Sequence, residues 1–357
     1  MDILFSEDLQ HLSRRAFLKK AQAGLLGLFL LPLRERALGR ERLVPAGQEG
    51  VPEMGRMLDD ATPVYKEPSF SSKLVNMYWR DLVYPITAAT VGDKEPDHNR
   101  VWYQISNGGY IHSGKVQPVA LKSNPVVESV PKTGLLAEVS VPFTDARLDP
   151  NRPDRHAYRL YFSTTHWINA VVKDKQGKNW YRINDDKYKK TYFVSAEHLR
   201  PIPAEELTTL SPTVPAEEKR IEVRLEEQLV IAYEAGNPVF MTRTATGGRF
   251  IEGNYTTATG VFMTNRKRPS RHMASGDLAA PNSYDLPGVP WVCYLTLKGI
   301  SFHGTFWHND FGRPRSHGCL NLSSQAARWI YRWTLPHVPE GKHILEKQEG
   351  TRVDIVE

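Results

Sequence analysis

The chain has 357 residues, of which 40% are hydrophobic and 24% are charged. This composition is typical of a globular protein, excludes a wholly disordered chain and, at this length, predicts two or three domains. Two cysteines are too few for a disulfide framework or a four-cysteine zinc site, and no apolar run reaches the roughly 18 residues of a membrane span. Half of the net charge of +6 lies in residues 1–42, which hold eight basic and five acidic residues. The remainder is too weak to predict nucleic-acid binding.

The first forty residues (1–40) have the organisation of a targeting segment. Residues 13–19 have the sequence Ser-Arg-Arg-Ala-Phe-Leu-Lys and precede a mostly apolar run at 21–33, which is too short to span a bilayer. The segment resembles a twin-arginine export signal; the alternative is an ordinary amphipathic helix. The resemblance implies an extracytoplasmic protein, in the periplasm or at the wall face of the membrane. Arg34 and Arg36 follow the apolar run directly, so an uncleaved signal that acts as an anchor stays open.

The chain that follows is rich in short β-prone runs that recur. Residues 101–105 and 179–183 share a Trp-Tyr-x-Ile pattern, and each is followed by a segment that ends in x-x-Pro-aliphatic. The recurrence indicates an internal repeat of roughly eighty residues. Each copy resembles a small bacterial SH3-like β-barrel. The predicted boundaries are a linker at 41–60, a first module at 61–120 and a second module at 121–203.

Trp102 and Trp180 occupy the same place in the two copies. We expect both to be core residues, because a large aromatic side chain in the middle of a strand is usually packed. The alternative is that they line a groove that binds wall peptides.

A third domain follows and is expected to be mainly β. It opens on a predicted hairpin that turns at 235–238, and one helix is predicted over 325–333, with Ser323 or Ser324 as its N-cap. The predicted boundaries are a proline-rich linker at 204–216, the domain at 217–347 and a C-terminal tail at 348–357.

Residues suited to chemistry are concentrated in two stretches of this domain: Ser301-Phe302-His303-Gly304-Thr305 and Ser316-His317-Gly318-Cys319-Leu320-Asn321. Cys319 is set among polar groups beside a glycine, which is not the setting of a core thiol. A free thiol, with a pKa of about 8.5, needs a cationic or general-base neighbour to supply the thiolate, and His303 could act from an adjacent strand. Gly318 leaves room for a substrate carbonyl, and the backbone N–H groups at Gly318 and Cys319 could bind the developing oxyanion.

These stretches resemble the signature of the L,D-transpeptidase family, which is a histidine, a spacer and then Ser/Thr-His-Gly-Cys-aliphatic-Asn or Arg. His303 and residues 316–321 match it position by position. Residues 244–247 and 255–262 resemble the family's threonine-glycine and Thr-Pro-x-Gly-x-Phe segments, with Ala258 where proline is usual. The resemblance implies a β-sandwich-like catalytic domain, acyl transfer on peptidoglycan stem peptides and no cofactor.

The resemblance also implies a role for each residue. Cys319 attacks the bond between a third-position diamino acid and D-alanine in a tetrapeptide stem, and an amine of a neighbouring stem resolves the thioester. His303 is the general base and acid, and the Gly304 carbonyl orients its ring. His317 shapes the pocket and polarises the oxyanion region. The other expected site residues hold the loop or line the substrate site: Ser316, Asn321, Tyr294, Trp307 and His308.

Other interpretations of these residues stay open. Cys319 could be a buried structural thiol, or it could bind zinc with His303, His308 and His317, although no paired metal-ligand spacing is present.

The sequence also predicts the structural role of Cys293 and of a basic segment. Cys293 lies in an apolar run and is expected to be an inert strand residue that forms no disulfide with Cys319. The basic segment 266–272 is expected to be a solvated loop; the alternative is a lid that contacts anionic wall polymer or stem-peptide carboxylates.

The alternative functions that we consider all act on the bacterial cell wall or bind to it. If water resolves the thioester, the protein is an L,D-carboxypeptidase, which the sequence does not separate from a transpeptidase. A papain-like wall endopeptidase is disfavoured, because its cysteine precedes its histidine. A wall-binding protein with an inactive third domain is the non-enzyme alternative. We expect a monomer that binds stem peptides, with further wall binding through the modules, and acylation of Cys319 by carbapenems.

Overall fold

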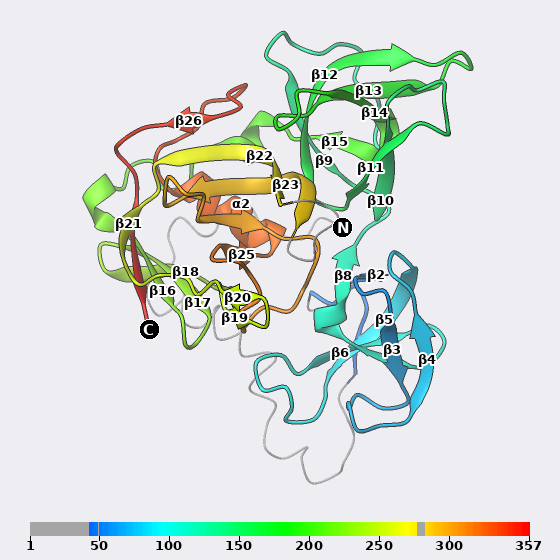
Figure 1. Ribbon diagram of the computed structural model, residues 1–357, viewed down its shortest axis with the longest axis vertical. Helices are drawn as coiled ribbons and strands as arrows, with labels where there is room; N and C mark the ends of the chain where they lie inside the picture. Colours follow the sequence, from blue (N-terminus) through cyan, green and yellow to red (C-terminus); the bar gives the residue numbers. More distant parts are fainter. Residues whose placement is uncertain (1–42, 49, 277–282) are drawn as a thin grey trace. The chain divides into compact units, whose positions relative to one another are not determined.

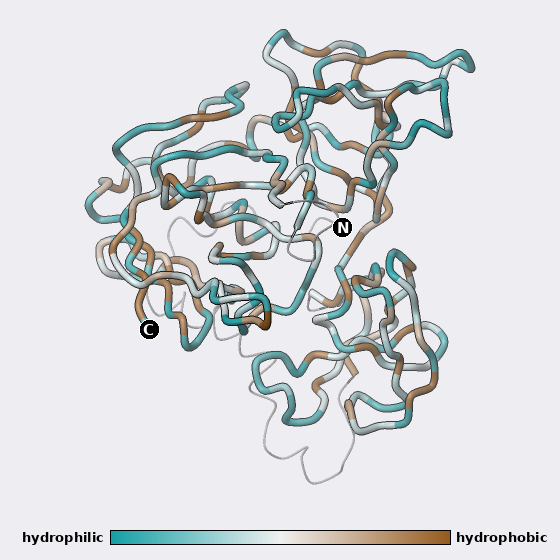
Figure 2. The backbone as a smooth tube through the Cα atoms, viewed as in Figure 1, coloured by the Kyte–Doolittle hydropathy of each residue, from teal (hydrophilic) through white to brown (hydrophobic). Residues whose placement is uncertain are grey.

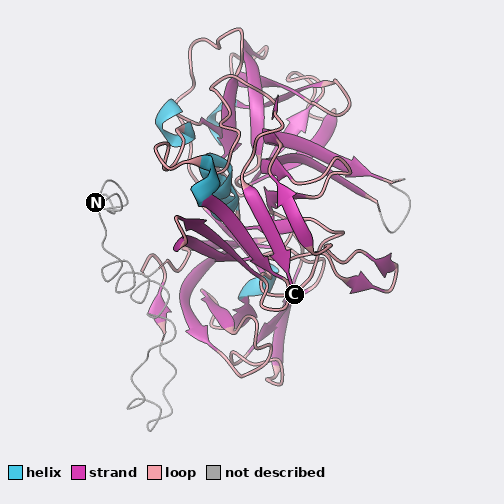
Figure 3. Ribbon diagram, turned by 90° about the vertical axis from the view of Figure 1, so that its left-hand side faces the viewer, coloured by secondary structure: helices cyan, strands magenta, loops and turns pink. Residues whose placement is uncertain are grey.

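The computed structural model describes residues 43–48, 50–276 and 283–357, and Val44–Glu357 forms one compact unit (Figure 1). The predicted export signal at 1–40 lies outside the described residues. The described chain is mainly β (Figure 3). Its single α-helix, α2 (Ser324–Trp333), follows Cys319 as predicted. No helix in these ranges is long and apolar enough to cross a membrane.

The first sheet, which we call module 1, covers residues 44–119. Its strands pair in the order β4-β3-β7-β6-β5-β2-β8, and β1 pairs with β5. The bounds are β1 Val44–Pro45, β2 Met54–Met57, β3 Thr62–Tyr65, β4 Leu74–Tyr78, β5 Val83–Val91, β6 Val101–Ile105, β7 Tyr110–His112 and β8 Val116–Val119.

Module 1 starts earlier than predicted. Val44 pairs with Ala89 on β5, and β2 pairs with both β5 and β8, so the predicted linker at 41–60 is wrong over these strands. Met57 on β2 is fully buried. The two strands have two and four residues, which is too short for an alternating pattern to be recognised in the sequence.

The second sheet, which we call module 2, covers residues 135–201 and repeats the first. Its order, β11-β10-β14-β13-β12-β9-β15, matches that of module 1 strand for strand. The bounds are β9 Leu135–Val139, β10 Phe143–Arg147, β11 His156–Tyr161, β12 Thr165–Lys173, β13 Asn179–Asn184, β14 Thr191–Ser195 and β15 Leu199–Pro201.

The equivalent tryptophans lie in the cores of the two modules. Trp102 on β6 and Trp180 on β13 are buried, as predicted. Trp102 packs against Phe70 and His112, with ring centroids 4.8 and 5.3 Å away. The barrel prediction is not met in the described residues, because neither sheet has a pairing that joins its two outer strands.

The third domain contains two five-stranded sheets and the small hairpin β19-β20. One sheet has the order β18-β17-β16-β27-β21, and the other has the order β25-β24-β23-β22-β26. The bounds are β16 Lys219–Arg224, β17 Leu229–Glu234, β18 Asn237–Arg243, β19 Arg249–Phe250, β20 Gly253–Asn254, β21 Gly260–Met263, β22 Arg266–Ser275, β23 Tyr284–Tyr294, β24 Ser301–Gly304, β25 Leu320–Leu322, β26 Leu345–Glu346 and β27 Arg352–Val356.

Both sheets and α2 share one hydrophobic core. Val223 and Ile355 from the first sheet, Phe302 and Leu320 from the second, and Ile330 from α2 are all buried in it. Hydrophilic and hydrophobic residues are interspersed along the chain (Figure 2). Ser323 is the N-cap of the helix, because its side chain accepts a hydrogen bond from Ala326 N at 3.2 Å. The predicted hairpin is present as β17 and β18.

The predicted C-terminal tail is wrong. β27 lies in the middle of a sheet, where Val353 and Ile355 pair in parallel with Ile221 and Val223 of β16. The pairing partner lies more than a hundred residues earlier in the chain, so nothing in the local sequence indicates it.

The predicted proline-rich linker at 204–216 is packed against the third domain. Leu207 and Leu210 pack against its core. Glu206 forms ion pairs with Arg200 of module 2, at 2.7 Å, and with Arg328 of α2. Module 2 is therefore attached to the helix that follows Cys319.

The position of β27 leads to a stability prediction. Ile355→Ala should lower the free energy of unfolding by roughly 2–5 kcal/mol, because it opens a cavity in the shared core. Val356→Ala, on the exposed face of the same strand, should change it by less than about 0.5 kcal/mol. Urea unfolding of the two variants measures the difference; equal, small effects would contradict a core strand.

Candidate active site

His303 lies on β24, and Cys319 immediately precedes β25, the parallel strand beside it. β24 pairs with β25, with Phe302 opposite Leu320 and His303 opposite Asn321. Cys319 immediately precedes β25, so it lies beside Ser301, whose Oγ is 3.8 Å from the Cys319 Sγ. The pairing therefore places the thiol next to the strand that carries the histidine.

The His303 ring is held in one orientation. Its Nδ1 lies 3.1 Å from Gly304 O. Because a carbonyl oxygen only accepts hydrogen bonds, Nδ1 carries the ring proton and Nε2 is left as the acceptor. Burial lowers the pKa of His303 to about 4, so the ring is neutral at physiological pH.

The two cysteines are free and differ in exposure. Cys319 is half-buried, whereas Cys293 is fully buried in β23, as expected of an inert strand residue. Burial raises the pKa of both thiols. The resting pair at the site is therefore a neutral thiol and a neutral imidazole.

Ser316 closes the loop that carries Cys319. Its Oγ accepts a hydrogen bond from Gly318 N at 3.2 Å and donates one to Cys319 O at 2.5 Å. Gly318 has a φ of +112°, which L side chains rarely adopt, so glycine is needed there. Ser316 is buried and holds the loop rather than lining a substrate surface.

A threonine and a second glycine support this loop from behind. Thr257 Oγ1 accepts a hydrogen bond from Gly247 N and donates one to Gly318 O, both at 2.9 Å. A Cβ on Gly247 would lie 2.7 Å from Gly318 N, so the two backbones touch. In the sequence, Thr257 and Gly247 are recognisable only as parts of segments that resemble family motifs. Those motifs predicted no role for either residue.

Asn321 on β25 and His308 form a buried pair. Asn321 Nδ2 lies 2.9 Å from His308 Nε2, and His308 Nδ1 accepts a hydrogen bond from Asp310 N at 3.4 Å. Burial lowers the pKa of His308 to about 3. These contacts make both residues part of the scaffold.

The other expected site residues lie in different surroundings. His317 is exposed and packs edge-on against Tyr255, with ring centroids 4.2 Å apart. The Trp307 ring is 5.7 Å from that of His303. Tyr294 is buried, and the Arg266 guanidinium lies 4.0 Å from its ring centroid, so it is a core residue and does not line a substrate site.

The basic segment 266–272 is part of the strand β22, so the prediction of a solvated loop is wrong. Lys267 is buried and donates to Thr334 O at 2.8 Å. Arg268 and Arg271 both pair with Asp186 of module 2, and His272 is held between two aspartates. Arg268 and Arg271 thus bind module 2, and Lys267 binds a carbonyl of its own domain, which leaves little charge for an external anion.

The zinc alternative finds no support in the geometry. Within residues 43–48, 50–276 and 283–357, no group of three or more His, Cys, Asp and Glu side chains is arranged to hold a metal ion. His317 faces Tyr255 and His308 faces Asn321, so these rings do not converge on Cys319.

Comparison with known proteins identifies the third domain. Residues 218–355 match the family model of the YkuD L,D-transpeptidase catalytic domain, so this domain belongs to that family. The match covers this domain and supports an L,D-transpeptidase-type catalytic domain in the chain. A search of curated proteins found no match.

Solved structures that match part of the chain include L,D-transpeptidases. The Ldtfm–avibactam carbamoyl enzyme is 22% identical, with a TM-score of 0.31, 39% of this chain covered and 49% of the other. A mutant Enterococcus faecium L,D-transpeptidase is 21% identical, with a TM-score of 0.30 and coverage of 39% and 50%. The enzyme of Mycobacterium smegmatis is 16% identical, with a TM-score of 0.33 and coverage of 52% and 80%. This chain spans about half the length of the first two.

The buried His303 ring should titrate well below an ordinary histidine. We expect a midpoint near pH 4, because burial disfavours the imidazolium. Nitrogen-15 NMR of histidine-labelled protein measures it, and the His303→Gln variant assigns the signal by its loss. A midpoint near the ordinary value of about 6.5 would show that the ring is not buried in this way.

Thr257 should stabilise the cysteine loop through its hydroxyl group. Thr257→Val keeps the shape but leaves Gly247 N and Gly318 O unpaired, which should cost roughly 1–3 kcal/mol of unfolding free energy and change the alkylation rate of Cys319. Thr259→Val, at an exposed position, is the control and should change neither. Denaturant unfolding and iodoacetamide labelling are the measurements; a Thr257→Val protein that behaves like the control would disprove the role.

Proposed function

We propose that the chain is an exported enzyme that crosslinks peptidoglycan stems by L,D-transpeptidation. The observation that carries the proposal is the pairing of β24 with β25 together with the His303 Nδ1 to Gly304 O contact of 3.1 Å. The pairing sets the thiol beside the strand that carries the histidine, and the contact leaves Nε2 as the ring atom able to take a proton.

The first half-reaction is acylation. The Cys319 Sγ forms a bond to the carbonyl carbon that joins the diamino acid to D-alanine, and the thiol proton passes to His303 Nε2. The carbon–nitrogen bond then breaks as His303 gives that proton to the departing amine, which leaves the stem as a thioester. Gly318 N–H makes only a 3.2 Å hydrogen bond to Ser316 Oγ, so the developing oxyanion can compete for it.

The second half-reaction restores the thiol. An amine of a neighbouring stem attacks the thioester and loses a proton to His303 Nε2, which returns it to the departing Cys319 sulfur. The product is a crosslink between two third-position residues. If water attacks instead, the same site is an L,D-carboxypeptidase, and the outcome depends on whether an acceptor stem can displace water.

Export and wall binding complete the proposal. Residues 13–19 and the apolar run at 21–33 support delivery across the cytoplasmic membrane by the twin-arginine route. The repeated modules 1 and 2 accompany the catalytic domain on the same chain, which supports a role for them in contact with the wall.

The proposal is tested by intact-mass spectrometry of the purified chain with a disaccharide-tetrapeptide, for wild type and Cys319→Ala. A crosslinked dimer with release of D-alanine, absent in the variant, is the expected result. A carbapenem should likewise leave a covalent adduct on the wild type alone. Tripeptide without dimer would make the enzyme a carboxypeptidase. No turnover and no adduct would favour the wall-binding alternative.

A further inference from the structure

The sulfur of Cys319 lies against the turn at residues 295–300 and the first residue of β24. Its Sγ is 3.8 Å from Gly299 O and 3.8 Å from Ser301 Oγ. Cys319 is half-buried, so a substrate can reach the sulfur from one side, whereas Ser301 is fully buried beneath it. The backbone carbonyl and the hydroxyl are thus polar groups in contact with the reacting atom.

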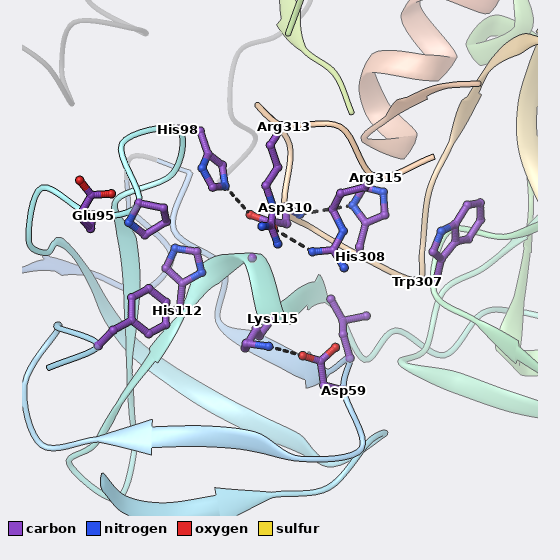
Figure 4. Close-up of a pocket in the computed structure, with 14 residues that line it drawn as sticks. Asp59, Glu95, His98, His112, Lys115, Trp307, His308, Asp310, Arg313 and Arg315 are labelled. Atoms are coloured by element: carbon purple, nitrogen blue, oxygen red, sulfur yellow. Dashed lines mark hydrogen bonds and ion pairs between the residues drawn. The ribbon is translucent and has the colours of Figure 1, made fainter. Parts of the chain in front are cut away.

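A cavity of about 300 Å³ elsewhere in the molecule is not lined by this sulfur. It lies where module 1 meets the 305–315 loop of the third domain, and Glu95, Trp307 and Arg313 are among the residues that line it (Figure 4). None of the described residues of its lining belongs to β24 or to the loop that carries Cys319. The polar surroundings of the nucleophile therefore come from the turn at residues 295–300 and from β24.

The donors and acceptors around the sulfur follow from their chemistry. A backbone carbonyl only accepts hydrogen bonds, so the thiol of Cys319 donates to Gly299 O. Within the described ranges, the Ser301 hydroxyl has no hydrogen-bond partner other than the Cys319 sulfur. Because a buried hydroxyl is nearly always hydrogen-bonded, the Ser301 O–H donates to the sulfur. The sulfur is thus a donor to one neighbour and an acceptor from the other.

The turn that carries the carbonyl is held by its own hydrogen bonds. Gly299 N donates to Thr296 O at 3.2 Å, and Ile300 N donates to Thr296 Oγ1 at 3.1 Å. Gly299 has a φ of +108°, a conformation that favours glycine. The Ile300 side chain lies against Gly318, where a Cβ would be 2.6 Å from Ile300 Cδ1. The turn is therefore packed directly on the loop that carries Cys319.

The two neighbours of the sulfur have opposite effects when the thiol ionises. Gly299 O then faces a negative sulfur without a proton between them, which disfavours the thiolate. The Ser301 O–H keeps its proton, and its hydrogen bond to the sulfur becomes charge-assisted, which favours the thiolate. Burial raises the pKa of the Cys319 thiol, and hydrogen bonds from the backbone and the side chain of Ser301 oppose that rise.

Ser301 also lies on the side of β24 that carries the general base. Side chains alternate along a strand, so Ser301 and His303 point to one side and Phe302 to the other. Phe302 is in the shared hydrophobic core, which leaves Ser301 and His303 on the opposite side. A thiolate that accepts a hydrogen bond from Ser301 is therefore on the same side of β24 as the ring that takes the thiol proton.

We propose that Ser301 is a catalytic residue that stabilises the Cys319 thiolate through the hydrogen bond from its hydroxyl. The inference rests on the proposed function, in which that sulfur attacks the stem. Ser301 transfers no proton and forms no bond to the substrate: the thiol proton passes to His303 Nε2, and the Ser301 hydroxyl is unchanged after each half-reaction. Its effect is to increase the fraction of thiolate at a buried position that otherwise disfavours charge.

The pH dependence of Cys319 alkylation tests the inference without any substrate. Iodoacetamide reacts with the thiolate, so the labelling rate rises with pH through the pKa of the thiol. In the full chain, Ser301→Ala should move the midpoint upward by about one pH unit, or roughly tenfold less thiolate at a given lower pH, because a charge-assisted hydrogen bond is lost. Ser301→Thr keeps a hydroxyl and should restore the wild-type midpoint. Cys319→Ala gives the background labelling.

The matched control is Thr334→Val, which removes a buried hydroxyl that lies 3.8 Å from the sulfur of the other cysteine, Cys293. It should leave the Cys319 midpoint unchanged. A wild-type midpoint in Ser301→Ala, an equal rise in Thr334→Val, or a Ser301→Thr midpoint as high as that of Ser301→Ala would overturn the inference. Release of D-alanine from the tetrapeptide reports separately on the proposed function, because the alkylation needs no turnover.

Discussion

The parallel pairing of β24 with β25 is the constraint on which the site depends. A 15-residue connection between Gly304 and Leu320 joins the two strands. It forms the 305–315 loop and then the turn at residues 316–319 that carries Cys319, which we call the cysteine turn. Parallel strands cannot be joined by a tight turn, so a long connection is required. The connection supplies Trp307, His308 and Asp310, and it returns the chain with Cys319 next to the histidine strand.

The cysteine turn needs support because its own conformation is unfavourable. Gly318 has a positive φ, and the turn is kept in place by Ser316 within it and by Thr257 and Gly247 behind it. The donors and acceptors of this backbone are thereby satisfied away from water. Burial also keeps the histidine and the thiol neutral at rest, which suits a mechanism in which charge appears only as the substrate reacts.

The repeated modules are attached to the third domain through different elements. Module 1 contacts the loop after the histidine, through Asp310 and Arg56. Module 2 contacts β22 through Asp186, and its last strand reaches α2 through Glu206. Such contacts differ from the flexible linkers that commonly join binding modules to enzymes. The modules therefore border the catalytic domain and can shape what reaches it.

The sequence by itself determined the local features of this protein. A compact motif predicted Cys319 and His303, the repeated Trp-Tyr-x-Ile pattern predicted two similar modules with buried tryptophans, and the spacing of apolar residues predicted α2. Each depends on residues that are close together in the chain, where propensity, periodicity and capping act.

Only the tertiary structure decided the features that depend on distant partners. β27 is a central strand because β16 lies beside it, the basic segment 266–272 is a strand whose cations meet Asp186, and Tyr294 is buried beneath Arg266. The cavity at module 1 likewise joins Glu95 to a loop more than two hundred residues later. Pairing and charge neutralisation across such separations are set by packing, which local sequence patterns do not report.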